Sequence, residues 1–395
     1  MHIVVAPDSF KESMSARKAA GAMARGIAAA DQSIEVIELP VSDGGEGFLD
    51  AVCDPLGAQR REFAVAGPMG VLVAAHYCWV ESTKTALVEV AQIVGPQLIS
   101  AKGRDIWRAS SEGLGQLLVH LRDLGAKQIV IGLGGTMTND GGLGMAAALG
   151  ITLLDGHGMN LPPALSSLRD ARTLRLPSAG VLPGIQITLA TDVDAPLLGP
   201  NGASAMFGPQ KGASVDDVPR LDAALAKWAR LLQEATGVDV STISGGGAAG
   251  GIGAALVALA GAKITSGIDL VLDLIDFDGH MSRLHPGDLV FTGEGKVDRQ
   301  TSEGKAPWGV CQAALRRGIR TVAFCGVRGR GVADLIGPDA FLEVVEIVPP
   351  EQPREEALAQ GPPNLAKSVA EFVSSRLSAH RRGSRTYDLR KLETP

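Results

Sequence analysis

The chain has 395 residues, a formal net charge of −6 at pH 7, 45% hydrophobic residues and only 4% aromatic residues. This length predicts two or three domains with aliphatic cores, and the acidic balance argues against nucleic-acid binding, which needs basic surfaces. No run approaches the roughly 20 apolar residues of a membrane helix, so we expect no membrane association.

Strand and helix signals alternate along the chain. Apolar β-branched runs predict strands at residues 3–6, 34–39, 86–90, 128–131, 186–190, 288–291, 321–325 and 344–348. Helical spacing predicts helices from about Ser15 to Ala30 and at 110–124, 141–149, 216–235, 247–261, 305–317 and 364–379. This alternation is typical of parallel sheets in α/β proteins. Residues 61–90 contain short β-like pieces without a helix, which favours antiparallel strands there.

Polar clusters follow the first two predicted strands. Asp8, Ser9 and Lys11 come after the first strand, where open α/β sheets bind ligands. An acid, a hydroxyl and an ammonium suit an anionic substrate, although an ordinary polar turn fits equally well. Residues 42–47, which include Asp43, Gly44 and Gly45, follow the second strand and suit an anion or a plain turn into a helix.

The loop at residues 132–145 has the sequence GLGGTMTNDGGLGM and follows the strand at 128–131. It offers backbone donors, hydroxyls, an amide and a carboxylate from Gly134, Gly135, Thr136, Thr138, Asn139 and Asp140. We expect such a loop to bind phosphate oxygens and magnesium. Glycine is abundant throughout, with 50 residues, which predicts close backbone approaches to a ligand.

Carboxylates and glycines recur after the next strand. Asp192 and Asp194 follow the strand at 186–190, a suitable place for a base or a metal ligand. Lys211 could neutralise phosphate or simply be solvated. Residues 244–253 contain a GxGxxG pattern at Gly245, Gly247 and Gly250, but the strand before it is poor, so a glycine-rich helix start explains it better than a dinucleotide fingerprint.

Residues 292–305 are densely charged and include Glu294, Lys296 and Lys305 after the strand at 288–291. An ordinary charged surface loop is the alternative. The chain has no GxxxxGK[ST] motif, which argues against a Walker-type NTPase.

The four cysteines, Cys53, Cys78, Cys311 and Cys325, are far apart in sequence. We interpret them as reduced thiols of a cytoplasmic protein, without a disulfide framework or zinc site. The chain opens on a strand without a signal peptide. The arginine-rich residues 381–395 are expected to form a mobile tail or a subunit contact, in a monomer or a homodimer.

Polar or glycine-rich clusters thus follow five predicted strands. Without a Cys-His or Ser-His nucleophile pattern, this inventory favours phosphoryl transfer, which needs positioning, magnesium and charge neutralisation.

The clusters also resemble a known family. VAPDSFKES, VSDGGEG, GLGGTMTNDGGLGM, DVDAPLLGPNGASAMFGPQKGAS, GGGAAGGIGAAL and TGEGKVDRQTSEGKAP are similar, in order, to motifs of the bacterial glycerate kinase family that forms 2-phosphoglycerate. The resemblance runs from residue 1 to about 378. It departs from the family pattern at Ala195, at 109–112 and at Cys325-Gly326.

The resemblance implies two α/β domains with an active-site cleft between them. A Rossmann-like domain would comprise residues 1–65 and 286–380, and a second α/β domain, residues 66–285, would be inserted into it. The implied reaction is ATP-dependent phosphorylation of D-glycerate at the C2 hydroxyl. The alternatives are a nicotinamide-dependent dehydrogenase, based on Gly245, and a non-catalytic sensor of sugar acids.

Residue roles follow from this reading as hypotheses. Asp192 is the first candidate for the base, with Asp8 and Asp43 behind it. Lys296 and Lys305 are candidates for stabilising charge on the transferred phosphoryl group. Substrate would be bound by Ser9, Lys11, Asp43, Gly44 and Gly45. ATP would be bound by Gly134, Gly135, Thr136, Asn139, Gly247, Gly250, Glu294 and Lys305, and Mg²⁺ by Asp140 and Asp192.

Overall fold

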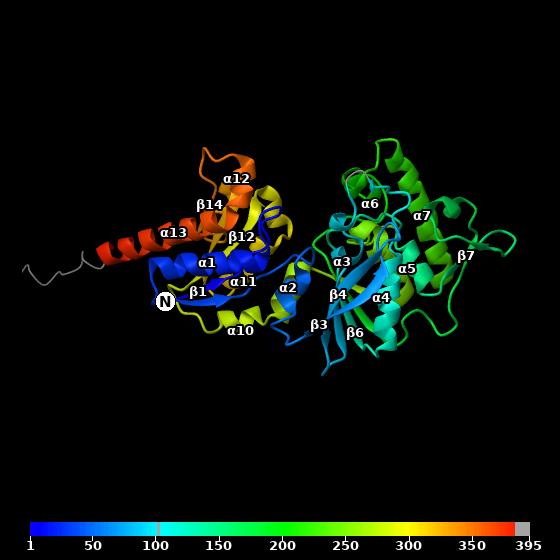
Figure 1. Ribbon diagram of the computed structural model, residues 1–395, viewed down its shortest axis with the longest axis horizontal. Helices are drawn as coiled ribbons and strands as arrows, with labels where there is room; N and C mark the ends of the chain where they lie inside the picture. The colour runs from blue at the N-terminus through cyan, green and yellow to red at the C-terminus, as the bar shows by residue number, and fades with distance from the viewer. Residues whose placement is uncertain (101–102, 384–395) are drawn as a thin grey trace, which may run out of the picture. The chain divides into compact units, whose positions relative to one another are not determined.

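The computed structural model describes residues 1–100 and 103–383 (Figure 1). They form two compact α/β units. Unit 1 comprises Met1–Val41 and the described residues from Asp276 on, and unit 2 comprises Ser42–Ile275. These limits differ from the domain boundaries expected near residues 65 and 285, because the strand at Gln59–Ala66 pairs along its length within the sheet of unit 2.

Unit 1 contains one sheet of five parallel strands. Their order is β14 (Glu343–Glu346), β13 (Arg320–Arg328), β12 (Leu289–Val297), β1 (His2–Val5) and β2 (Glu35–Glu38). Polar loops that leave the carboxyl ends of these strands therefore emerge along the same edge of the sheet.

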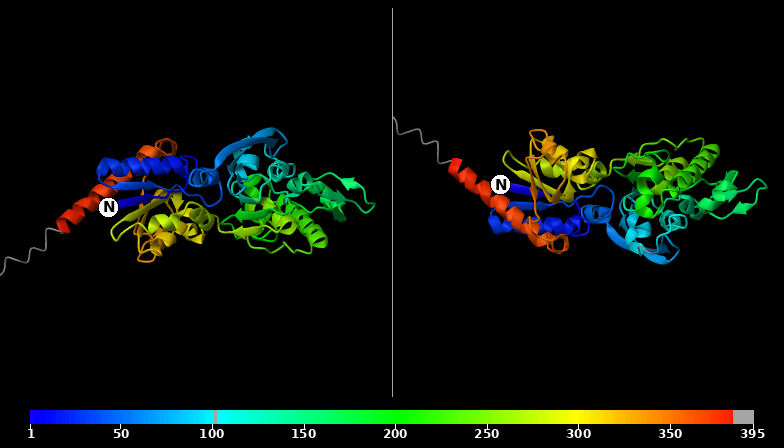
Figure 2. Two further views of the ribbon diagram at one scale, coloured as in Figure 1. Left: turned by 90° about the horizontal axis from the view of Figure 1, so that it is seen from below. Right: turned by 90° about the horizontal axis from the view of Figure 1, so that it is seen from above.

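Alternate strand residues point to opposite faces of this sheet, and both faces carry buried apolar side chains. Helices therefore cover both faces. Val322 and Phe324 of β13 pack in the core beneath α1 (Ala16–Ala30) and α13 (Gly361–Gly383). Ala323 and Cys325 pack in a second core with α11 (Ala306–Leu315). Figure 2 shows α13 alongside α1, where a Cβ on Gly26 would lie 2.3 Å from the Ala366 carbonyl oxygen.

The remaining elements of unit 1 are short. They are α10 (Phe277–Met281), η6 (Arg299–Glu303), η7 (Val332–Leu335) and α12 (Arg354–Ala359). Helix α1 begins where the sequence predicts it, because the side chain of Ser15 accepts a hydrogen bond from the backbone N–H of Lys18.

Unit 2 is built on a six-stranded mixed sheet. Its order is β11 (Lys263–Thr265), β10 (Gln186–Ala190), β6 (Gln128–Gly132), β5 (Thr85–Glu89), β4 (Leu72–Val80) and β3 (Gln59–Ala66). The first four strands are parallel, and β4 and β3 are antiparallel, as expected for residues 61–90. A small antiparallel sheet of β8 (Asn160–Leu161), β7 (Thr152–Leu154) and β9 (Thr173–Arg175) was not predicted.

Helices pack around the large sheet of unit 2 and share one core with it. They are α3 (Ala91–Val94), α4 (Glu112–Asp123), α5 (Leu143–Ala148), α6 (Ala203–Phe207), α7 (Asp217–Thr236) and α8 (Ile252–Ala260). Further helices of unit 2, α2 (Phe48–Val52) and α9 (Gly267–Leu274), contact each other. Short turns of 3₁₀ helix lie at η1 (Pro96–Leu98), η3 (Leu165–Arg169), η4 (Pro209–Lys211) and η5 (Ala248–Gly251).

The predicted strands and helices are confirmed, with one change that affects the candidate site. Strand β12 continues to Val297, so Glu294 and Lys296 lie within a strand and not in a loop. The pairing with β13 extends to Val297 and Arg328 and stabilises this extension. The predicted basic tail lies mostly outside the described residues, and α13 continues to Gly383.

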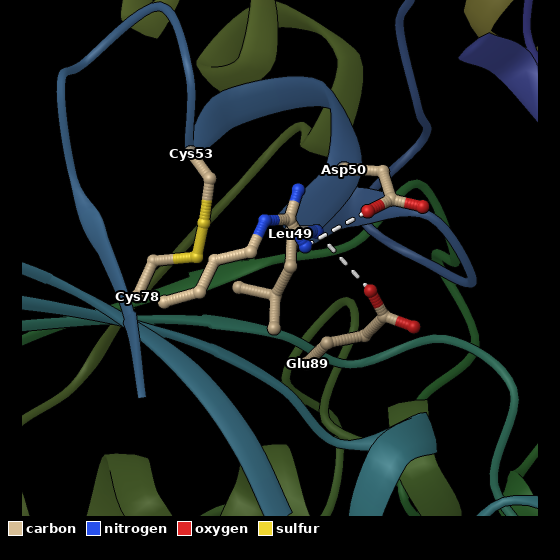
Figure 3. The surroundings of a disulfide bond; sticks show 6 residues. Leu49, Asp50, Cys53, Cys78 and Glu89 are labelled. Atoms are coloured by element: carbon tan, nitrogen blue, oxygen red, sulfur yellow. Dashed lines mark hydrogen bonds and ion pairs between the residues drawn. A yellow bond between two sulfur atoms is a disulfide. The ribbon is translucent and has the colours of Figure 1, made fainter. Parts of the chain in front are cut away.

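The expectation of four reduced thiols is wrong for one pair. Cys53, at the end of α2, and Cys78, in β4, form a disulfide bond (Figure 3). Their Cα atoms are 5.9 Å apart, within the range that a disulfide spans. Sequence spacing could not show this proximity, because the fold brings the two cysteines together. Disulfide bonds are common in oxidising compartments, so a cytoplasmic location stays a prediction.

Cys311 and Cys325 are free and buried. Burial raises the pKa of each thiol to about 12, so both stay protonated at neutral pH. Among residues 1–100 and 103–383, none of the helices combines the length and the apolar character needed to span a bilayer.

Candidate active site

The predicted site residues fall into two groups, one in each unit. The group in unit 1 comprises Asp8, Ser9, Lys11, Glu294, Lys296 and Lys305. The group in unit 2 comprises Asp43, Gly44, Gly45, Gly134, Gly135, Thr136, Asn139, Asp140, Asp192, Gly247 and Gly250.

In unit 1, the loop after β1 lies beside the end of β12. The backbone N–H of Asp8 donates to the carbonyl oxygen of Gly293 at 2.9 Å. A Cβ on Gly295 would lie 3.3 Å from the backbone nitrogen of Lys11. The Asp8 carboxylate accepts the backbone N–H of Ser9 at 2.6 Å, which fixes its orientation at this edge.

Charged side chains of β12 and of the loop after it form a connected network. The buried Glu294 carboxyl accepts the Thr301 hydroxyl at 2.8 Å and lies 3.5 Å from the Lys305 Nζ. Burial raises the pKa of Glu294, and the charge of Lys305 opposes that rise. Lys296 pairs with Asp298 at 2.7 Å. Lys305 also lies 4.0 Å from the Asp298 carboxylate, so Lys296 and Lys305 lie in one electrostatic cluster.

In unit 2, three loops touch at the carboxyl edge of the parallel strands. Gly44 has a φ of 86°, and a Cβ there would lie 2.8 Å from the Ala190 carbonyl oxygen. A Cβ on Gly134 would lie 2.4 Å from the Cα of Gly45. Only glycine permits these approaches. The glycines thus bring the Asp43 loop against the ends of β6 and β10.

Asp192 lies directly beyond β10 and is half-buried. Its two carboxylate oxygens accept the backbone N–H groups of Gly267 at 2.8 Å and Ile268 at 3.1 Å, at the start of α9. Burial raises the pKa of Asp192 to about 6; a hydrogen bond from Ser266 lowers it, and the negative charge of Asp43 raises it further. A carboxylate with this pKa suits a general base near neutral pH.

The Asp43 loop is locked to the same helix start. A Cβ on Gly267 would lie 2.0 Å from the Asp43 carbonyl oxygen. The Asp43 carboxylate in turn accepts the backbone N–H of Gly45 at 3.0 Å. Asp43 and Asp192 are therefore neighbours around the first turn of α9, which the residue pattern alone did not reveal.

The Asp43 loop is also held at its other end by Glu89, which the sequence analysis did not single out. This buried carboxyl group lies at the end of β5 and accepts the backbone N–H of Leu49 in α2 at 3.1 Å (Figure 3). Burial raises the pKa of Glu89, and the backbone hydrogen bond to Leu49 opposes the rise. The signal that could have identified it is an acidic residue inside the apolar run at 86–90.

Asp140 is an internal anchor. Its carboxylate accepts the backbone N–H and hydroxyl of Ser111, at 2.9 and 2.7 Å, and the backbone N–H groups of Gly142 and Gly144, each at 3.1 Å. A carboxylate has about four acceptor positions. This arrangement does not fit Asp140 as a direct magnesium ligand, because its acceptor capacity is already used by the protein.

Lys211 is a buried amine beside the same loop. Its Nζ donates to the Thr138 carbonyl oxygen at 2.8 Å and to the Thr136 hydroxyl at 3.2 Å. Burial lowers the pKa of Lys211 to about 7, and the charge of Asp140 opposes the decrease. Asn139 is fully buried and donates to the Ser204 hydroxyl at 3.0 Å. Thr136 and Asn139 thus help to fix the loop internally.

The glycines at 245–251 serve close packing. A Cβ on Gly247 would lie 2.3 Å from the Pro196 carbonyl oxygen, and one on Gly250 would lie 2.1 Å from the Thr138 carbonyl oxygen. The element before this stretch is the helix α7. A dinucleotide fingerprint requires a strand at that position, so this segment does not support a dehydrogenase.

No group of three or more His, Cys, Asp or Glu side chains in the described parts of the chain is arranged to hold a metal ion. Asp43 and Asp192 remain the acidic pair at the carboxyl edge of unit 2. An oxygen-rich pair of this kind suits Mg²⁺ bound together with substrate phosphates, since magnesium often uses only one or two protein carboxylates.

Comparison with known proteins identifies relatives over nearly the whole chain. The model of the glycerate kinase family matches residues 3–376. A glycerate 2-kinase of Escherichia coli K12 is 39% identical, with 87% of this chain and 91% of that protein covered. A glycerate kinase of Bacillus subtilis 168 is 37% identical, covering 95% and 97%. A solved structure from Salmonella typhimurium LT2, described as a candidate glycerate kinase 2, is 35% identical with a TM-score of 0.80, covering 98% and 99%.

Proposed function

Because the chain belongs to the glycerate kinase family, we propose that it transfers the γ-phosphoryl group of ATP to the C2 hydroxyl of D-glycerate, giving 2-phosphoglycerate and ADP. The observation that carries the catalytic part of this proposal is the Asp192 carboxylate. It is held by two backbone N–H groups at the carboxyl end of a parallel strand, with its pKa raised to about 6.

Asp192 acts as the base in this proposal. It accepts the proton of the C2 hydroxyl as the oxygen attacks phosphorus, and its hydrogen bonds to Gly267 and Ile268 fix its direction. Asp43 makes Asp192 a stronger base, because the two negative charges repel each other. In kinases such a carboxylate orients the nucleophile as much as it takes the proton.

Unit 1 supplies the cationic groups. We assign Ser9 and Lys11 to the carboxylate of glycerate, and Lys296 to the charge on the transferred phosphoryl group. The Lys305–Glu294 ion pair belongs to the same network of charged side chains as Lys296. Asp8 is kept as a positioning residue, because its carboxylate is oriented by the Ser9 N–H. That both units face a shared cleft stays a prediction.

The glycine-rich loops of unit 2 shape the nucleotide site. The backbone N–H groups of Gly45, Gly134 and Gly250 already donate to Asp43, Gly44 and Gly247, respectively. We therefore assign these glycines to close packing of the loops rather than to direct phosphate binding. The N–H of Gly247 likewise donates to the Ala195 carbonyl oxygen at 2.9 Å, so Gly135 and Thr136 remain the candidates for contact with ATP.

Magnesium would bind beside Asp43, where it would neutralise charge on the phosphates. Asp192, which the sequence also suggested as a ligand, is kept as the base, because a carboxylate bound to the metal could not accept the proton. Asp140 is not included among the proposed ligands, because its carboxylate already accepts four hydrogen bonds.

The test is production of ADP from ATP and Mg²⁺ that depends on added D-glycerate. Asp192→Asn should lower kcat much more than it raises KM, because it removes an interaction needed in the transition state. An unchanged kcat in this variant would remove Asp192 from the chemistry, and ADP production without a need for glycerate would refute the proposed reaction.

A further inference from the structure

Unit 1 carries a strongly basic pocket that the mechanism above uses only in part. It has a volume of about 610 Å³ and is lined by Lys296, Asp298, Arg299, Gln300, Arg328, Gly329 and Arg330. We call it the arginine pocket. Four of its lining residues are cationic and one is acidic. It lies just beyond the paired carboxyl ends of β12 and β13, where open parallel sheets bind their ligands.

The backbone holds these like charges together. The N–H of Gly329 donates to the Val297 carbonyl oxygen at 2.7 Å, and the N–H of Arg299 donates to the Arg330 carbonyl oxygen at 3.0 Å. A Cβ on Gly329 would lie 2.5 Å from the Cβ of Asp298, so only glycine lets the two segments approach. The pocket is therefore a built feature of the two strand ends.

The charges in the pocket are not balanced by the protein. The single carboxylate, Asp298, is used by Lys296 at 2.7 Å and by the backbone N–H of Gln300 at 3.0 Å. Burial would raise the pKa of Asp298, but these contacts and the nearby Lys305 keep it lowered. Within residues 1–100 and 103–383, no acidic side chain forms an ion pair with the guanidinium groups of Arg299, Arg328 or Arg330. Clustered unpaired cations repel one another, and a bound anion would remove that cost.

We propose that the arginine pocket binds phosphoryl groups, either the polyphosphate chain of the nucleotide or the phosphate of the phosphorylated acid. This inference rests on the proposed function and specifies where its phosphate charge is held. Guanidinium groups match phosphate oxygens with two parallel hydrogen bonds, and they keep their charge at every physiological pH. The backbone N–H groups of Gly45, Gly134 and Gly250 already donate within unit 2. Because they are not free to bind phosphate, cationic side chains are the better candidates for that role.

The test measures binding to the full chain by calorimetry at low salt, without turnover. Sodium tripolyphosphate represents the nucleotide chain, and 2-phosphoglycerate represents the phosphorylated acid. The double variant Arg328→Gln/Arg330→Gln is compared with Arg376→Gln, which removes an exposed arginine of α13 outside the pocket. Arg330→Lys keeps the charge but loses the fork-shaped donor.

We expect the double variant to bind its ligand at least tenfold more weakly, Arg330→Lys to lie between it and the wild type, and the control to stay within twofold. Loss confined to tripolyphosphate assigns the pocket to the nucleotide, and loss confined to 2-phosphoglycerate assigns it to the acid. Unchanged affinity for both ligands would overturn the inference. Because binding is read without catalysis, a failure of the chain to phosphorylate glycerate would refute the proposed function and leave this result intact.

Discussion

The Asp192 carboxylate accepts the backbone N–H of Gly267 at 2.8 Å, and this bond ties the end of β10 to the start of α9. The same glycine lies so close to the Asp43 carbonyl oxygen that it has no room for a side chain. One contact therefore sets the direction of the proposed base and the position of the neighbouring acidic loop.

The first prediction concerns pH. Asp192 has a pKa raised to about 6, and it can accept a proton only when it is ionised. We expect kcat/KM for D-glycerate to fall about tenfold per pH unit below pH 6 and to level off above it. Asp192→Asn should lose about 10²- to 10⁴-fold in kcat and lack this acidic limb. A wild-type profile that stays flat down to pH 4.5 would contradict the assignment.

The second prediction concerns Gly267. In Gly267→Ala the new Cβ would lie 2.0 Å from the Asp43 carbonyl oxygen, so the Asp43 loop or α9 must move. We expect kcat to fall at least tenfold, with a loss of stability of about 1 to 3 kcal/mol from overpacking. Gly337→Ala is the matched control, because a Cβ there would meet nothing within 4 Å. Kinetic constants and urea unfolding measure both effects, and full activity in Gly267→Ala would show that the loop tolerates displacement.

The third prediction concerns Lys211. Burial lowers its pKa to about 7, below the value of about 10.5 that it has in an unfolded chain. The folded state therefore disfavours its protonation, so the stability that this group contributes is greatest above pH 10.5 and is lost as pH falls toward 7. Lys211→Met removes the titrating group. The Tm of the wild type minus that of Lys211→Met should rise from pH 7 to pH 10, whereas a constant difference would contradict the lowered pKa.

Much of this architecture could be predicted from the sequence, because strands and helices depend on local periodicity. The run at residues 3–6 and the helix after Ser15 illustrate this. The pairing of Asp192 with the first turn of α9 could not be predicted, because it joins residues 75 positions apart. Ser266 did indicate where α9 begins, since a serine directly before a helix is a common N-cap.

Asp140 shows the limit of reasoning from residue type. A carboxylate in a glycine-rich loop suits magnesium in principle, yet the folded chain surrounds it with donors from Ser111, Gly142 and Gly144. The cysteines show the same limit, because sequence separation does not reveal which ones the fold brings together. Charged residues 299, 328 and 330 likewise form one pocket only through the pairing of β12 and β13.

The fourth prediction concerns the Cys53–Cys78 disulfide. It closes a loop of 25 residues, for which loop-closure entropy gives about 3 to 4 kcal/mol of stabilisation. We expect protein purified without reductant to show two free thiols after denaturation, those of Cys311 and Cys325. Reduction should lower the Tm, and Cys53→Ala/Cys78→Ala should be insensitive to reductant. Four titratable thiols in the unreduced wild type would show that the bond does not form.

The position of the new phosphate tests the central claim most directly. Wild-type protein is incubated with ATP, Mg²⁺ and D-glycerate labelled with ¹³C at C2, and the product is examined by ³¹P and ¹³C NMR. The account predicts an ester at the C2 oxygen, as 2-phosphoglycerate, formed in equal amount to ADP. Phosphate on the C3 oxygen, or ATP left unconsumed in the presence of D-glycerate, would contradict it.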